Sequence, residues 1–137
     1  MSKAFLKESD SDGDDDLDIT TPPLPPGTRN YMTPAGYQRL REEASRLVDV
    51  ERPAAARAQS ESGDPASGKR RLHEIDRRIA FLTSRLNLAE VVDASRQEEV
   101  DHVVFGATVT YATDSGEEHT VTIVGIDEAD PAQGTIS

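Results

Sequence analysis

Two stretches of the chain carry apolar residues at alternating spacings of three and four. The first stretch contains Tyr37, Leu40, Ala44 and Leu47, and the second contains Leu72, Ile75, Ile79, Leu82 and Leu86. This spacing places one apolar seam along each of two helices, and a turn-rich segment separates them. The pattern predicts an antiparallel helical hairpin, a short coiled coil, over residues 29–92.

The limits of the two helices follow from local signals. Thr33 and Pro34 provide a capping hydroxyl and a proline at the first helical position, so the first helix should begin there. Pro53 should kink or end this arm, and the second helix should start after Gly68. Matching the seams allows two registers, with the hairpin folding near residue 61 or near residue 65. The turn-forming residues at 63–68 favour the second register.

The apolar pattern changes after Asp93. β-branched and aromatic residues alternate within 103–113, residues 114–116 form a turn signal, and a second β-type run covers 120–126. A third strand is expected at 134–137, where the sequence appears cut short. We therefore expect an α+β protein in which a linker (93–101) joins the hairpin to an incomplete antiparallel β domain (102–137). Three strands with an open edge form a poor independent domain.

Composition places a different kind of segment at the N-terminus. Residues 1–28 are rich in Asp, Ser and Pro, which predicts a disordered acidic tail with a short polyproline-like spacer. The 137 residues contain no cysteine, which excludes disulfides, thiolate metal sites and cysteine nucleophiles. No apolar run approaches the roughly 20 residues that a membrane helix needs. We expect a cytoplasmic monomer without membrane association.

Charge is distributed unevenly along the chain, whose net charge is −11. Residues 29–89 carry twelve basic and eight acidic side chains, whereas the segments on both sides are acidic. A basic middle suggests a negatively charged partner. The candidates form one basic run on the second helix: Lys69, Arg70, Arg71, Arg77 and Arg78. The alternative is pairing within the helix, because Glu74 lies four residues from both Arg70 and Arg78.

Several stretches together resemble the Gre family of transcript-cleavage factors, specifically its GreB-like members. The longest are KRRLHEIDRRI at 69–79 and VTIVGIDE at 121–128, and shorter ones are YMTPAGY at 31–37, ERP at 51–53, FLT at 81–83 and FGA at 105–107. The resemblance covers about residues 29–137. It implies a coiled coil followed by an FKBP-like β domain.

The resemblance also implies a function. Family members bind bacterial RNA polymerase, and their β domain docks at its rim while the coiled coil enters the secondary channel. Acids at the coiled-coil tip then help to hold a catalytic Mg²⁺, and polymerase cuts the nascent RNA near its 3′ end in backtracked, arrested complexes. A protein of this kind is an accessory factor and not an enzyme. The basic run would contact the RNA or the polymerase.

The tip departs from the family pattern. Glu61 matches the family's glutamate, but Ala58 replaces the usual aspartate, and Asp64 follows three residues after Glu61. Carboxylates suit Mg²⁺ because this ion prefers hard oxygen ligands, so Glu61 and Asp64 are the candidate metal-binding pair. The arm before the tip is also about nine residues shorter, which removes about 13 Å of helix. The alternatives are a non-cleaving channel binder that modulates transcription, and an inactive truncated paralogue.

Overall fold

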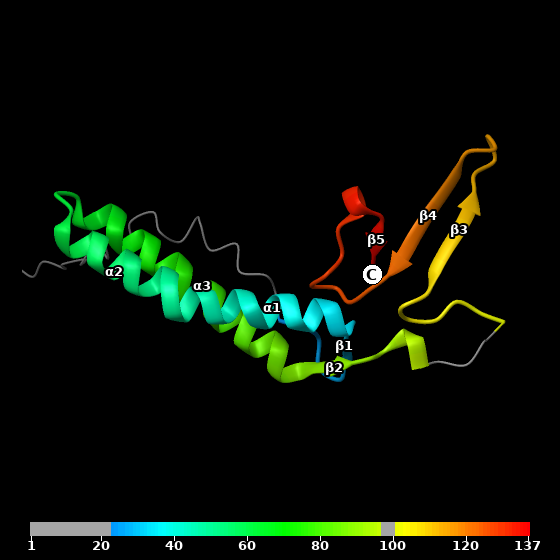
Figure 1. Ribbon diagram of the computed structural model, residues 1–137, viewed down its shortest axis with the longest axis horizontal. Coiled ribbons are helices and arrows are strands. Elements are labelled where there is room, and N and C mark those ends of the chain that lie inside the picture. The colour runs from blue at the N-terminus through cyan, green and yellow to red at the C-terminus, as the bar shows by residue number, and fades with distance from the viewer. Residues whose placement is uncertain (1–22, 97–100) are drawn as a thin grey trace, which may run out of the picture.

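The computed structural model describes residues 23–96 and 101–137, and its main feature is a long two-helix hairpin with strands at one end only (Figure 1). The first arm consists of α1 (Pro34–Arg46), the π-helical segment η2 (Leu47–Glu51) and α2 (Arg52–Glu61). The second arm is α3 (Pro65–Leu88), whose 24 residues extend for about 36 Å. The predicted antiparallel hairpin is confirmed.

The first residues of the two helices can be compared with the start signals predicted from the sequence. Thr33 caps α1 through its hydroxyl, which accepts the N–H of Gly36 at 3.0 Å, as predicted. The second helix begins at Pro65, so the expected start after Gly68 is wrong. Asp64 caps it, with its carboxylate accepting the N–H of Ser67 at 3.4 Å. Gly68 lies within the helix, where a Cβ would come 2.7 Å from Gln59. This glycine therefore permits the two arms to approach closely and does not form the turn.

The turn of the hairpin is Ser62–Gly63–Asp64, between the two expected positions. Pro53 interrupts the α-helical pattern as predicted, but it does not end the arm. The N–H of Arg52 donates to the carbonyl of Leu47, five residues earlier, which is the bond of a π-turn. A wider turn just before a proline relieves the clash between the proline ring and the preceding carbonyls. The chain thus continues as one arm from Pro34 to Glu61.

A short parallel ladder closes the base of the hairpin. Strand β1 (Asn30–Met32) pairs with β2 (Ala89–Val91), and Met32 is fully buried. The amide of Asn30 donates to the carbonyl of Arg85 at 3.0 Å. The sequence pattern does not predict these strands, because three residues are too few to establish an alternating pattern.

The C-terminal sheet has the order β3–β4–β5. Strand β3 (Thr108–Ala112) and β4 (Glu118–Ile123) form the predicted hairpin, with its turn at residues 113–117. Strand β5 (Thr135–Ile136) pairs with β4 in parallel, so the sheet is mixed and the expected antiparallel arrangement is only partly right. The 3₁₀ turn η4 (Pro131–Gln133) and Gly134, with φ of 78°, return the chain to the side of β4.

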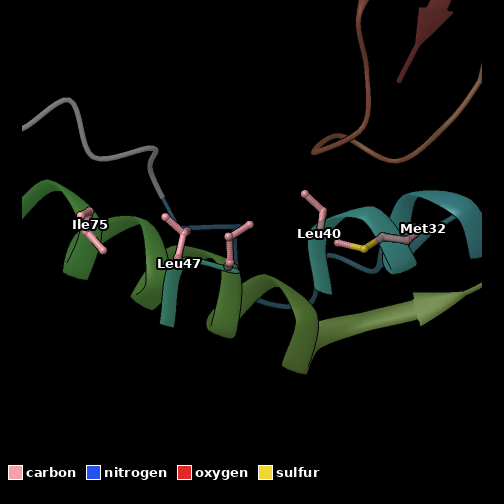
Figure 2. Close-up of a cluster of buried hydrophobic side chains, with 5 residues drawn as sticks. Met32, Leu40, Leu47 and Ile75 are labelled. Atoms are coloured by element: carbon pink, nitrogen blue, oxygen red, sulfur yellow. The ribbon is translucent and has the colours of Figure 1, made fainter. Parts of the chain in front are cut away.

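The buried core lies between the helices and at their base. It contains Met32, Leu40, Leu47, Ile75 and Leu82 (Figure 2).

Most of the predicted acidic tail, residues 1–22, lies outside the described residues, as do positions 97–100 of the predicted linker. The start of that linker contains the 3₁₀ turn η3 (Ala94–Arg96). Among the helices that the structure describes, none combines the length and apolar character required to cross a membrane.

Candidate functional site

The tip of the hairpin, residues 61–64, presents two carboxylates at the end farthest from the strands (Figure 1). Glu61 is the last residue of α2 and Asp64 precedes α3, so the two acids flank the turn. The hydroxyl of Ser62 accepts the N–H of Asp64 at 2.9 Å and holds the turn in shape. All four tip residues are exposed, and Ala58 is exposed one turn before Glu61.

The two tip acids are not equivalent. One carboxylate oxygen of Asp64 is directed to the helix N-terminus, where it caps α3. Glu61 forms no hydrogen bond or ion pair with any residue that the structure describes. Within the same part of the chain, no group of three or more His, Cys, Asp or Glu side chains could hold a metal ion. The tip therefore offers at most two carboxylates, which fits a metal shared with another molecule better than a metal held by this chain alone.

The basic run divides into two parts. Lys69, Arg70 and Arg71 lie on the first two turns of α3, directly behind the tip, and all three are exposed. Arg71 contacts Glu74 at 3.6 Å. The expected pairs of Glu74 with Arg70 and Arg78 are not the ones observed among the described side chains. The end of the hairpin thus combines two acids at the turn with three cations immediately behind them.

The other two cations lie farther from the tip. Arg78 forms a bidentate pair with Glu43 of α1, with both N–O distances at 3.0 Å, and its guanidinium lies 5.3 Å from the centre of the Phe81 ring. Arg77 is half-buried. Arg78 therefore connects the two arms, and its charge is partly neutralised by Glu43. A second link of this kind joins Arg52 to Asp76 at 2.6 Å, and this hydrogen bond raises the pKa of Arg52.

A polar cluster at the opposite end of the hairpin was missed by sequence reasoning. Asp127 and Glu128 follow β4 and contact the hairpin base. The Nε of Arg85 lies 3.6 Å from Oδ2 of Asp127, and both side chains are at least nine-tenths buried. Burial raises the pKa of Asp127, and the charge of Arg85 opposes this rise. Glu128 accepts hydrogen bonds from Thr33 and Gly125. The sequence signals were two adjacent acids after an apolar strand, at the end of the family-like stretch 121–128.

Comparison with known sequences covers both parts of the molecule. A family profile described as "Transcription elongation factor, N-terminal" matches residues 30–91, and one described as "Transcription elongation factor, GreA/GreB, C-term" matches residues 97–137. The boundary between the two profiles falls at the predicted linker.

Individual relatives match most of the chain. The transcription elongation factor GreB of Neisseria meningitidis serogroup B is 52% identical over 119 residues, covering 80% of this chain and 73% of the relative. GreB of Pasteurella multocida is 42% identical over 117 residues, covering 79% and 73%. The crystal structure of GreA factor homolog 1 (Gfh1) of Thermus thermophilus aligns with a TM-score of 0.45 at 24% identity, covering 80% of this chain and 77% of that one. On the sequence matches, the chain belongs to the GreA/GreB family of transcription elongation factors.

Proposed function

We propose that this protein is a transcription elongation factor that inserts its hairpin into the secondary channel of RNA polymerase and stimulates cleavage of nascent RNA in backtracked complexes. The observation that carries the proposal is the separation of the two ends of the molecule. The tip acids and three exposed cations lie at one end, and the strands lie at the other (Figure 1). A hairpin only two helices thick can enter a pore that the whole molecule cannot.

The tip acids supply negative charge for a shared metal site. Glu61 and Asp64 would hold Mg²⁺ jointly with carboxylates of the polymerase, since the described residues form no cluster of three or more ligands that could hold the ion without a partner. A bound Mg²⁺ at such a site lowers the pKa of a coordinated water and stabilises the charge that develops on the phosphate. Glu61 is the better placed of the two acids, because its carboxylate is not used as a helix cap.

The exposed cations provide a counterpart for RNA. Lys69, Arg70 and Arg71 follow the tip within two turns of helix, a distance of about 10 Å at 1.5 Å per residue. They can therefore contact phosphates of the displaced RNA 3′ segment while the acids face the reacting phosphate. The two charge signs would therefore have separate tasks at the end of the hairpin. We propose that Arg77 and Arg78, being farther from the tip, contribute less to RNA contact than these three residues.

The strands at the base would remain outside the pore. In this proposal the β unit, which we define as residues 101–137, contacts the outer surface of the polymerase while the hairpin extends inward. In this proposal the RNA is cut at the polymerase active site. The protein is accordingly an accessory factor in the reaction.

The direct test uses purified polymerase halted on a template with its transcript labelled at the 5′ end. Adding the protein together with Mg²⁺ should shorten the labelled RNA and restart synthesis when nucleotides are supplied. The matched control is the same complex without the protein, incubated for the same time. Arrested elongation without shortening would instead identify a non-cleaving occupant of the channel, and the cleavage proposal would then be wrong.

A further inference from the structure

We propose that Glu128 is a positioning residue that fixes the β unit to the start of α1 and so sets the direction in which the hairpin leaves the β unit. The importance of this direction rests on the proposed function, in which both ends contact one polymerase. The connection between the β unit and α1 is a property of the free protein and does not depend on polymerase. We call it the Glu128 joint, and it consists of Glu128 and Gly125 from the β unit and Thr33 and Gly36 from the hairpin.

The Glu128 carboxylate accepts three hydrogen bonds, two from Thr33 of the hairpin and one from Gly125 of its own β unit. Its Oε2 accepts the N–H of Thr33 at 3.0 Å and the N–H of Gly125 at 2.7 Å. Its Oε1 accepts the hydroxyl of Thr33, and that hydroxyl in turn caps α1 by accepting the N–H of Gly36. The carboxylate thus lies at the positive end of the helix dipole, where negative charge is favourable. One side chain from the β unit completes the start of a helix in the other unit.

Two glycines provide the space for this contact. Gly36 and Gly125 are both buried. A Cβ on Gly36 would overlap the carboxyl group of Glu128, and a Cβ on Gly125 would overlap the carbonyl oxygen of Tyr31. The fit is therefore close on both sides of the carboxylate. Neither glycine has a positive φ, so close approach is the reason for glycine at these positions, and backbone conformation is not.

Glu128 acts with a second connection. The buried pair of Arg85 and Asp127 joins α3 to the β unit on an adjacent side. Two connections to the two arms of the hairpin oppose rotation of the β unit better than one. Glu128 is the one that can be tested cleanly, because a change at Asp127 would also disturb the surroundings of the buried Arg85 guanidinium.

A fixed direction matters because the protein would contact polymerase at two places. When two contacts belong to one rigid body, the second forms without a further loss of orientational freedom. If the Glu128 joint were loose, the contacts of the hairpin and of the β unit with polymerase would both still form. Forming the second contact would then cost more orientational freedom. Loosening should therefore weaken binding while cleavage at saturating protein stays close to its normal rate.

The first experiment measures the joint without polymerase. Because the chain contains no cysteine, spin labels can be attached at Ser84→Cys on α3 and Glu118→Cys on β4, both exposed positions. The distribution of distances between the two labels, measured by double electron–electron resonance, should be narrow in the otherwise unchanged protein. It should broaden in Glu128→Ala and stay narrow in the control Glu117→Ala, an exposed glutamate of the β3–β4 turn.

Two further variants distinguish the joint from general damage. Glu128→Gln should retain a narrow distribution, because its carbonyl oxygen can accept both N–H groups while its amide donates to the Thr33 hydroxyl. Gly36→Ala should broaden the distribution although alanine favours helix more than glycine does. Combined with Glu128→Ala, the change at Gly36 should have little further effect, because the overlap is gone. Equal distributions in all of these variants would overturn the proposal.

The second experiment measures the consequence for polymerase. In Glu128→Ala, the protein concentration giving half-maximal cleavage should rise about tenfold, and the rate at saturation should stay within about twofold of normal. Glu128→Gln should restore the half-maximal concentration. A broadened distribution with unchanged affinity would show that the direction does not matter and would overturn the positioning role. If the unmodified protein stimulates no cleavage, the proposed function fails, while the distance measurement still tests the joint.

Discussion

Replacing Glu61 by glutamine should lower protein-dependent RNA cleavage roughly a hundredfold at saturating protein, a loss typical of removing one group that stabilises transition-state charge. Glutamine keeps the shape of the side chain but removes the negative charge with which Glu61 would hold the proposed shared Mg²⁺. Binding to polymerase should change little, because the fold is kept: Glu61 has no partner among the described residues, and the proposed contacts of the basic residues and of the β unit remain. Cleavage is measured on halted complexes, and affinity is measured by competition with the unmodified protein.

The matched control for this change is Asp49→Asn. Asp49 is an exposed acid on the same arm, in the π-helical segment and away from the tip. It should retain normal cleavage, since charge at that depth does not reach the reacting phosphate. Full activity in Glu61→Gln would show that the tip acid is not involved, and equal losses in both variants would indicate a general effect of charge.

Asp64 requires a different substitution, because it also caps α3. Asparagine caps a helix about as well as aspartate, so Asp64→Asn removes the charge and leaves the helix start intact. Its cleavage rate should fall less than that of Glu61→Gln, because one oxygen of Asp64 is directed to the N–H of Ser67. A larger loss at Asp64 than at Glu61 would reverse the two roles.

Replacing Leu82 by alanine should destabilise the hairpin by about 2–5 kcal/mol, the usual range for a fully buried leucine. Leu82 has no exposed surface and packs in a cluster of five buried side chains among the described residues. A core this small has few other contacts to compensate for a cavity. We therefore expect a large fall in the melting temperature. Thermal unfolding is measured by circular dichroism at the α-helical band.

Leu88→Ala provides the control for Leu82→Ala. It makes the same chemical change on the same helix, but Leu88 is 57% exposed. Its effect should stay within about 0.5 kcal/mol, as for other surface substitutions. Similar melting temperatures for the two variants would show that the hairpin is not held together by the core between its arms.

The sequence was sufficient to predict the hairpin, because two seams with helical spacing allow few other arrangements. It was insufficient for the exact start of α3. A glycine such as Gly68 can either form a turn or permit a close helix contact, and the sequence alone does not distinguish the two. The parallel ladder of β1 and β2 was also missed. It depends on Asn30 and Arg85, 55 positions apart in the sequence, meeting at the base of the hairpin, which no local pattern encodes.

The candidate site shows the same division. Tip acids and a basic run are visible in the sequence because neighbouring residues create them. The pairing of Arg78 with Glu43 and the lock of Glu128 on Thr33 join residues 35 and 95 positions apart. Such contacts follow from the tertiary arrangement. Charge spacing along one helix predicted that Glu74 pairs with Arg70 and Arg78, whereas the structure pairs it with Arg71. Local chemistry was therefore predictable, and contacts between elements were not.

The most direct measurement of the central claim is cross-linking from the tip. A photoreactive group attached at Ser62→Cys, the sole cysteine in that variant, is introduced into backtracked complexes with labelled RNA. The tip probe should cross-link to the 3′ segment of the transcript, and the same probe at Glu117→Cys in the β unit should not. A bound protein whose tip probe reaches neither the RNA nor the polymerase interior would contradict the account.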